Sequence, residues 1–300
     1  MKGMGTSHGA ATIVNAIANG KGAAFGLDLK TEATVELTEG EGINVTMDGL
    51  VGESTALVER CVLGVLERVG SGKRYHAEVR TSSQIPVSRG LKSSSAAANA
   101  VVLATLDALN VEMDLVDAVR IGTRAAIDAG VSVTGAFDDA CACALGGVVL
   151  TDNRSEEILF HGPMPDYFRA LIYVPPFQVR KASLPRKRMA AVKGLVDLAF
   201  EVAQEGDYFR ALTLNGMHPG HHLHSGIEGV GGAVHPQDVR PLPHHPFHQL
   251  LDGQVVAEGV YHHDLVPPRL LDAAGEVEEP QRRPLLGGPP RRGSEHELHS

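Results

Sequence analysis

The sequence predicts a fold that combines strands and helices, on three observations. Up to about residue 47, the chain consists of short runs rich in β-forming residues, separated by turns that contain glycine. From there to about residue 214, apolar residues recur mostly at helical spacing. An apolar content of 43% is enough for a hydrophobic core and excludes a chain that is disordered throughout. A length of 300 residues suits one large domain or two moderate ones.

The individual elements follow from local composition and periodicity. Gly20-Lys21-Gly22 has the composition of a turn between the first two strands. The helix expected at 93–109 is nearly all small or apolar, which predicts burial of most of its surface. Asp114 is suited to cap the next helix. The expected strands are 5–16, 23–29, 32–37, 43–47, 75–80, 148–150 and 170–174, and the expected helices are 54–69, 93–109, 114–129, 187–204 and 207–214.

One loop carries most of the functional information, and it connects the strand at 75–80 to the helix at 93–109. The first amides of a helix have no partner inside the helix, and the helix dipole makes that end positive, so a phosphate is favoured there. Two cationic side chains in the loop add to this effect. An ordinary serine-capped helix after a glycine turn is the alternative. The loop reads Pro86-Val87-Ser88-Arg89-Gly90-Leu91-Lys92-Ser93-Ser94-Ser95-Ala96.

The end of this loop resembles the second motif of the GHMP kinases, which usually reads Gly-Leu-Gly-Ser-Ser-Ala-Ala after a proline and a short spacer. Here Lys92 stands where most members carry glycine, and this variant resembles the archaeal type of shikimate kinase. The resemblance covers about residues 1–215. Its three segments are Gly90-Leu91-Lys92-Ser93-Ser94-Ser95-Ala96-Ala97, Ser7-His8-Gly9-Ala10-Ala11-Thr12-Ile13-Val14-Asn15-Ala16 and Val133-Thr134-Gly135-Ala136-Phe137-Asp138-Asp139-Ala140-Cys141.

The resemblance implies an α+β fold with the two-domain GHMP arrangement and a left-handed crossover. Residues 1–150 would form the N-terminal ATP-binding domain, and residues 151–215 the start of the C-terminal domain. The implied activity is transfer of the ATP γ-phosphate to the 3-hydroxyl of shikimate, in aromatic amino-acid biosynthesis. A GHMP kinase for another small alcohol, such as homoserine or mevalonate, is the second hypothesis. The chain contains no Gly-x-x-x-x-Gly-Lys-Ser/Thr motif, which excludes a P-loop kinase.

The resemblance also implies roles for single residues, with ATP and Mg²⁺ as cofactors. The segment 86–96 would bind the nucleotide, with Ser93, Ser94 and Ser95 around the phosphates and Ser94 or Ser95 reaching Mg²⁺. In relatives, the segment that contains His8, Thr12 and Asn15 lines the acceptor site. His8 and Thr12 share parity along a strand, so they could face one pocket. A partly exposed strand would explain these residues equally well.

The acidic pair Asp138-Asp139 is the candidate for catalysis. A carboxylate near the transferring phosphate can hold a metal or accept the proton of the acceptor hydroxyl. The spacing of Asp139 from Gly146-Gly147 and from Asp128 resembles that in the mevalonate kinase branch. This favours Asp139 as the catalytic aspartate and Asp128 as a possible metal ligand, with Asp138 as the alternative catalytic residue. A helix cap followed by a first-turn acid would also explain the pair.

The composition changes sharply at about residue 216. Twelve of the fifteen histidines and eleven of the seventeen prolines lie in 216–300, which contains no lysine. The third family motif, which resembles Gly-Leu-Ser-Gly-Thr-Gly-Pro, is not found there. We therefore expect an atypical tail over 216–300 and hypothesise that it is translated out of frame. A non-catalytic product with a damaged C-terminal half is thus the third functional hypothesis.

Charge and cysteine usage exclude several other classes. The net charge of −9, without a basic stripe interleaved with aromatics, argues against a nucleic-acid partner. Cys61, Cys141 and Cys143 form no disulfide framework, which favours a reducing cytoplasm. No run approaches the roughly 20 apolar residues that span a bilayer, and the N-terminus lacks the apolar core of a signal peptide. The expected partner is a small-molecule substrate, without nucleic acid or membrane.

Overall fold

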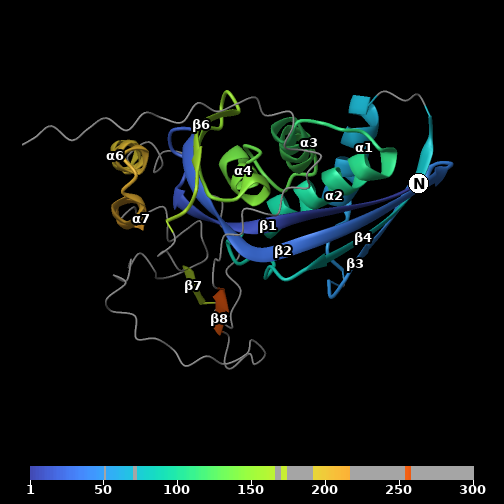
Figure 1. Cartoon of the computed structure of the whole chain (residues 1–300), viewed down its shortest axis with the longest axis horizontal. Helices are drawn as coiled ribbons and strands as arrows, with labels where there is room; N and C mark the ends of the chain where they lie inside the picture. The colour runs from blue at the N-terminus through green and yellow to red at the C-terminus, as the bar shows by residue number, and fades with distance from the viewer. Residues whose placement is uncertain (51, 70–72, 166–169, 174–191, 217–253, 258–300) are drawn as a thin grey trace, which may run out of the picture. The chain divides into compact units, whose positions relative to one another are not determined.

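The computed structural model describes residues 1–50, 52–69, 73–165, 170–173, 192–216 and 254–257. A six-stranded sheet is its main feature, and helices α1 to α4 lie together over one side of it (Figure 1). The strands are β1 (Lys2–Val14), β2 (Lys21–Glu39), β3 (Gly42–Met47), β4 (Tyr75–Ser83), β5 (Val148–Asp152) and β6 (Glu157–Gly162). The helices are α1 (Ala56–Val69), α2 (Ser93–Leu109), α3 (Leu115–Asp128) and α4 (Phe137–Leu145). This mixed architecture agrees with the expected fold class.

Strand β2 organises the sheet. It pairs antiparallel with β1 along one edge, and on its other edge with β5 over its first part and β4 over its second part. The sequence predicted two strands here, 23–29 and 32–37, and that prediction was wrong. Lys30 and Thr31 carry no turn propensity, so the chain continues as one strand of 19 residues and absorbs the irregularity as a register shift opposite β1.

The two halves of β2 have different surroundings. From Thr31 to Leu37, buried and more exposed residues alternate, which is typical of a sheet covered on one face. From Gly22 to Phe25, every residue is buried. The helix α6 (Lys193–Gln204) contributes Val196 and Phe200 to the core cluster that contains Ala23, Ala24 and Phe25 of this first part of β2. The candidate site described below is built beside this fully covered half.

Helix α2 packs unusually close to β1, and glycines in the strand make this possible. A Cβ at Gly3 would lie 2.1 Å from the amide nitrogen of Ala108, and one at Gly5 would lie 2.2 Å from the carbonyl oxygen of Ala100. No side chain fits at either position without moving the helix. The alanine-rich surface of α2 completes the close contact, so the predicted burial of this helix is confirmed.

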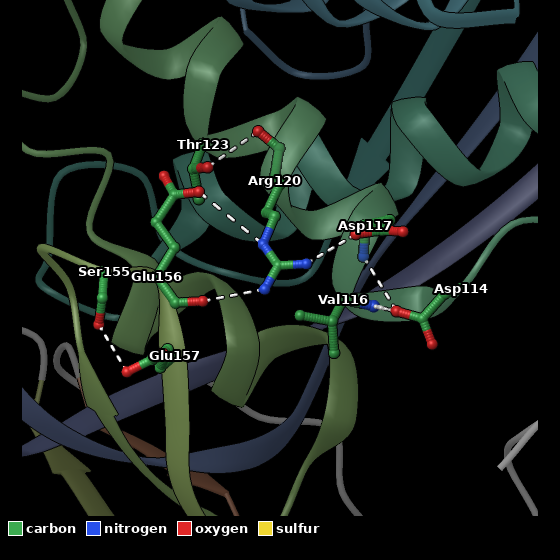
Figure 2. Close-up of polar contacts among 8 residues, drawn as sticks. All are labelled: Asp114, Val116, Asp117, Arg120, Thr123, Ser155, Glu156 and Glu157. Carbon is green, nitrogen blue, oxygen red and sulfur yellow. Dashed lines mark hydrogen bonds and ion pairs between the residues drawn. The ribbon is translucent and has the colours of Figure 1, made fainter.

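Most other predicted elements agree with the structure. Helix α2 has the predicted bounds, and α3 begins after Asp114, whose carboxylate accepts hydrogen bonds from the Val116 and Asp117 amides (Figure 2). Cys141 and Cys143 are buried core residues with free thiols. Strand β6 was not anticipated. Further described elements are α7 (Tyr208–Gly216), β7 (Ala170–Tyr173) and β8 (Gln254–Ala257), the last two paired antiparallel.

The predicted tail lies almost entirely outside the described residues. Only Gly216 and β8 belong to both, so the hypothesis of an out-of-frame segment stays a prediction. Residues 187–191, the start of the helix predicted at 187–204, also lie outside the described residues, so this part of the helix stays a prediction. Among the described helices, none combines the length and the apolar character needed to cross a membrane.

Candidate active site

The loop between β4 and α2 is fixed at both ends by buried apolar side chains. Ile85 and Leu91 lie in the same core cluster. The Leu91 carbonyl also accepts a hydrogen bond from the Ala10 amide of β1, at 3.3 Å. Between these anchors, Ser88 and Gly90 are exposed. The sequence thus forms a short surface loop whose path is set by two hydrophobic contacts.

Three residues of this loop adopt left-handed backbone conformations. They are Ser88, Gly90 and Lys92, with φ values of 59°, 78° and 62°. Glycine tolerates this region freely, whereas other residues incur about 1 kcal/mol or more. Lys92 immediately precedes α2 and makes no capping hydrogen bond with its side chain. The first amides of α2, together with the exposed Ser94 and the half-buried Ser93 and Ser95, therefore form the kind of helix start that binds anions.

The Lys92 side chain turns toward the start of α4. Its Nζ lies 3.1 Å from Oδ2 of Asp139, and the two side chains are only 20% and 14% exposed. Burial lowers the pKa of Lys92, but the carboxylates of Asp139 and Asp138 raise it by more, so its pKa lies above the ordinary value. The lysine therefore stays charged, and the pair joins the predicted phosphate loop to the predicted catalytic acid.

Asp139 retains an unused hydrogen-bonding atom. Its Oδ1 is buried and has no hydrogen-bond partner among the described residues, although most buried polar atoms in proteins have one. The residue lies in the first turn of α4, where the helix dipole favours a carboxylate. Such an atom, beside a lysine and a helix start, is suited to accept a hydrogen bond from a bound hydroxyl group.

Asp138 points to the other side, into the core. It is 4% exposed, and a Cβ built at Gly22 of β2 would lie 2.2 Å from its Oδ2. Asn153 donates a hydrogen bond to its Oδ1, at 2.7 Å. Burial first, and then the Asp139 carboxylate, raise the pKa of Asp138 to about 7. Two adjacent acids in the sequence thus have different environments, and only Asp139 faces the loop.

The predicted acceptor residues lie on and just after β1. Gly3 and Gly5 face α2, so alternation along the strand puts His8 on the opposite face. Thr12 lies beyond a register shift that follows His8, and both residues are partly buried. The pKa of His8 lies below its ordinary value, chiefly because of burial; the nearby Asp28 raises it and Lys30 lowers it by smaller amounts. Asn15 follows β1. Its side-chain Oδ1 accepts a hydrogen bond from the Ile17 backbone N–H, and its backbone N–H donates one to Asn215 Oδ1.

The predicted metal ligands differ in their surroundings. Ser94 and Ser95 lie in the first turn of α2, beside the loop. Asp128 lies at the end of α3, where its half-exposed carboxylate pairs with Arg124 at 3.2 Å. In the described part of the chain, no group of three or more His, Cys, Asp or Glu side chains could hold a metal.

Two asparagines that local sequence patterns do not single out contact α4, and of these Asn99 is buried and Asn153 partly buried. Asn153, in the turn after β5, contacts both the backbone and the side chain of Asp138. Asn99 of α2 donates to the Ala140 carbonyl at 2.9 Å, and the Ser7 hydroxyl of β1 donates to the Cys143 carbonyl at 2.9 Å. An asparagine in a turn or an alanine-rich helix carries no local signal for such long-range contacts.

Known proteins share both the sequence pattern and the fold. Residues 56–147 match the GHMP kinases N terminal domain. The chain is 50% identical to the shikimate kinase of Methanothrix thermoacetophila over 217 residues, which cover 72% of this chain and 73% of that one. It is 40% identical to the shikimate kinase of Pyrococcus furiosus over 236 residues, covering 78% and 85%. A homoserine kinase structure from Cytophaga hutchinsonii has a similar fold, with a TM-score of 0.54 at 22% identity over 72% and 71% of the chains.

Proposed function

The chain belongs to the GHMP kinases, in the branch of the archaeal-type shikimate kinases, and we propose that it phosphorylates the 3-hydroxyl of shikimate with ATP. The products would be shikimate 3-phosphate and ADP. The observation that carries the proposal is the pairing of Lys92, in the glycine position of the family's phosphate loop, with Asp139 of α4. This pair brings a phosphate-binding element and a proton acceptor to one place.

The loop and the start of α2 would bind the phosphates of ATP. The amides of the first helical turn donate hydrogen bonds to phosphate oxygens, and the hydroxyls of Ser93, Ser94 and Ser95 add further donors. The Lys92 ammonium group would neutralise phosphate charge as a point charge. The left-handed conformation of Lys92 supports this role, because a strained non-glycine residue is retained where the family usually has glycine.

Asp139 would act on the acceptor. Its Oδ1 accepts a hydrogen bond from the substrate hydroxyl and orients this oxygen toward the γ-phosphorus. As the new P–O bond forms and the bond between the β,γ-bridging oxygen and the γ-phosphorus breaks, the hydroxyl proton passes to the carboxylate. Asp138 is less suited to this task, because it is buried against β2 and bonded to Asn153.

A magnesium ion fits the same region. The hydroxyls of Ser94 and Ser95 lie at the helix start that would receive the phosphates, and they are the candidate protein ligands. When bound, the ion supplies positive charge that bridges and neutralises phosphate oxygens. Asp128 is paired with Arg124, and this contact gives its proposed role as a metal ligand no support.

An ADP-release assay coupled to pyruvate kinase and lactate dehydrogenase tests the proposal. The full chain is supplied with Mg-ATP and, separately, with shikimate, homoserine or mevalonate. Turnover with shikimate alone is expected. Turnover with another alcohol would reassign the acceptor, and no turnover with any of the three would favour the non-catalytic hypothesis.

His8→Ala and Thr12→Ala test the predicted acceptor residues. We expect each substitution to increase KM for shikimate and to leave KM for ATP unchanged.

A further inference from the structure

Helix α4 begins without a capping side chain of its own. The residue before it is Ala136, which has a left-handed backbone with φ of 51° and no side-chain acceptor for the first amides. These amides still need partners, because a helix start leaves several donors unsatisfied. The group that fixes the start of this helix must therefore come from elsewhere in the chain.

Asn153 supplies this group from the turn between β5 and β6. Its Oδ1 accepts a hydrogen bond from the Asp138 amide at 3.0 Å, and its Nδ2 donates one to Asp138 Oδ1 at 2.7 Å. The first bond caps the helix, and the second holds the side chain of the same residue. The Thr151 hydroxyl donates to the same Oδ1 at 2.7 Å, which sets the orientation of the amide.

The turn that carries Asn153 is itself held by its neighbours. The backbone N–H of Asn153 donates a hydrogen bond to the Gly20 carbonyl at 2.7 Å, and the Arg154 guanidinium donates one to the Asn19 carbonyl. On the other side, Figure 2 shows Arg120 of α3 reaching the carbonyl and the carboxylate of Glu156, with a 3.0 Å hydrogen bond to the carbonyl. The cap is thus presented by a braced turn.

We propose that Asn153 is a positioning residue for phosphoryl transfer: it caps α4 from outside the helix and thereby holds Asp139 toward Lys92. The inference rests on the proposed function, because it concerns the same catalytic carboxylate. Asp139 directly follows Asp138, so a rotation of the helix start would move its Oδ2 away from Lys92 Nζ, now 3.1 Å distant. Small displacements of reacting groups cost enzymes large factors in rate.

The first test compares Asn153→Ala with the wild type. We expect kcat for shikimate phosphorylation to fall on the order of tenfold, as for loss of one well-placed hydrogen bond, with KM for both substrates within about twofold. Asn44→Ala is the matched control. Asn44 also donates an amide hydrogen bond to a carboxylate, that of Glu78, at 2.7 Å on an exposed strand. The control should retain wild-type kcat.

A side-chain swap tests the cap itself. In Asn153→Asp combined with Asp138→Asn, the new carboxylate still accepts from the backbone amide of residue 138, and the new side-chain amide can donate back to it. We expect kcat to recover to within about threefold of wild type, whereas Asn153→Asp alone, which opposes two carboxylates, should be impaired at pH 8. Two results would overturn the inference. One is a wild-type kcat in Asn153→Ala, and the other is a double variant that unfolds at the same temperature as the wild type but does not recover kcat. If Asn153→Ala does not fold, Asn153→Asp takes its place.

A measurement without substrate separates this inference from the proposed function. Absence of shikimate turnover by the wild type would refute the function. The Asp138 carboxyl can still be titrated by carbon-detected NMR. The hydrogen bond from Asn153 lowers the pKa of Asp138, so Asp138 should titrate at higher pH in Asn153→Ala than in the wild type. Asp139 and Lys92, the charged groups that face Asp138, are present in both proteins. An unchanged titration would refute the contact between Asn153 and the Asp138 side chain, and with it the positioning role, whatever the substrate.

Discussion

The starts of helices α3 and α4 solve the same problem in different ways. Helix α3 follows Asp114, which has an extended backbone and caps two amides of the first turn with its own carboxylate. Helix α4 follows Ala136, which is left-handed and cannot cap, so its start depends on Asn153 from a distant turn. Helix α2 resembles α4, since Lys92 is also left-handed and does not cap. Local chemistry fixes the start of α3, whereas a tertiary contact fixes the start of α4.

The difference has a functional reason. A side chain that caps a helix occupies the amides that could otherwise bind a ligand. At α2 these amides are left for phosphate. At α4 the cap comes from the core side, so Asp139 turns its Oδ2 toward Lys92 of the loop and keeps its Oδ1 without a hydrogen-bond partner among the described residues. The left-handed residues are the energetic cost of this arrangement, on the order of 1 kcal/mol each.

Substitution of Asp139 should have the largest effect. Asp139→Asn removes the proton acceptor while keeping the size of the side chain, and we expect kcat to fall on the order of 10³-fold. The ADP-release assay with shikimate measures this. Asp48→Asn is the control, because Asp48 pairs with Arg80 in an exposed contact away from the helix starts, and it should keep the wild-type kcat. A rate for Asp139→Asn within tenfold of wild type would contradict the catalytic role.

Substitution of Lys92 should come next and separates charge from backbone strain. Lys92→Met removes the charge, and kcat/KM for ATP should fall on the order of 10²-fold. Lys92→Gly removes the same charge but suits the left-handed conformation, so it should be equally inactive yet more stable than Lys92→Met by about 1 kcal/mol in urea unfolding. Lys2→Met, which breaks an exposed pair with Glu36, is the control. Equal stability of the two Lys92 variants would show that the strain is absent.

The sequence predicted those parts of the molecule that depend on neighbouring residues. The bounds of α2, the cap at Asp114 and the phosphate loop are all local patterns, and the structure agrees with the first two in detail. It missed features that depend on contacts between distant segments. The continuity of β2 is set by its two partner strands, and the Lys92–Asp139 pair is set by the packing of α2 beside α4.

The acidic pair shows the same limit on a small scale. Composition and spacing placed Asp138 and Asp139 at a helix start but left open which one is catalytic. The distinction follows from burial against Gly22 and from the bonds of Asn153, neither of which can be seen locally. A rotation of α4 by one residue would put Asp139 in the environment that Asp138 now has, so only the tertiary structure separates the two acids.

Asp138 also gives a prediction for the pH dependence of stability. Its pKa is about 7 in the folded protein, above the ordinary value, so the folded state binds the proton more tightly than the unfolded state does. The resulting stabilisation is complete below about pH 4 and is lost as the pH rises to about 7. Asp138→Asn does not titrate, so its stability relative to wild type should increase over this range and then level off. Urea unfolding at pH 4.5, 6 and 8 measures the difference, and a difference that does not change with pH would contradict the assignment.

The smallest effect is expected at the ordinary helix start. Asp114→Ala removes a cap that accepts bonds at 2.9 and 3.1 Å, and should lower the free energy of unfolding by about 1 kcal/mol with kcat unchanged. Asp114→Asn is the matched control, since asparagine caps about as well. Urea unfolding and the ADP-release assay together give both quantities. Loss of a cap at α3 should thus affect stability alone, whereas Asn153→Ala at α4 should affect kcat; a fall in kcat for Asp114→Ala as large as that for Asn153→Ala would remove the distinction between scaffold and site.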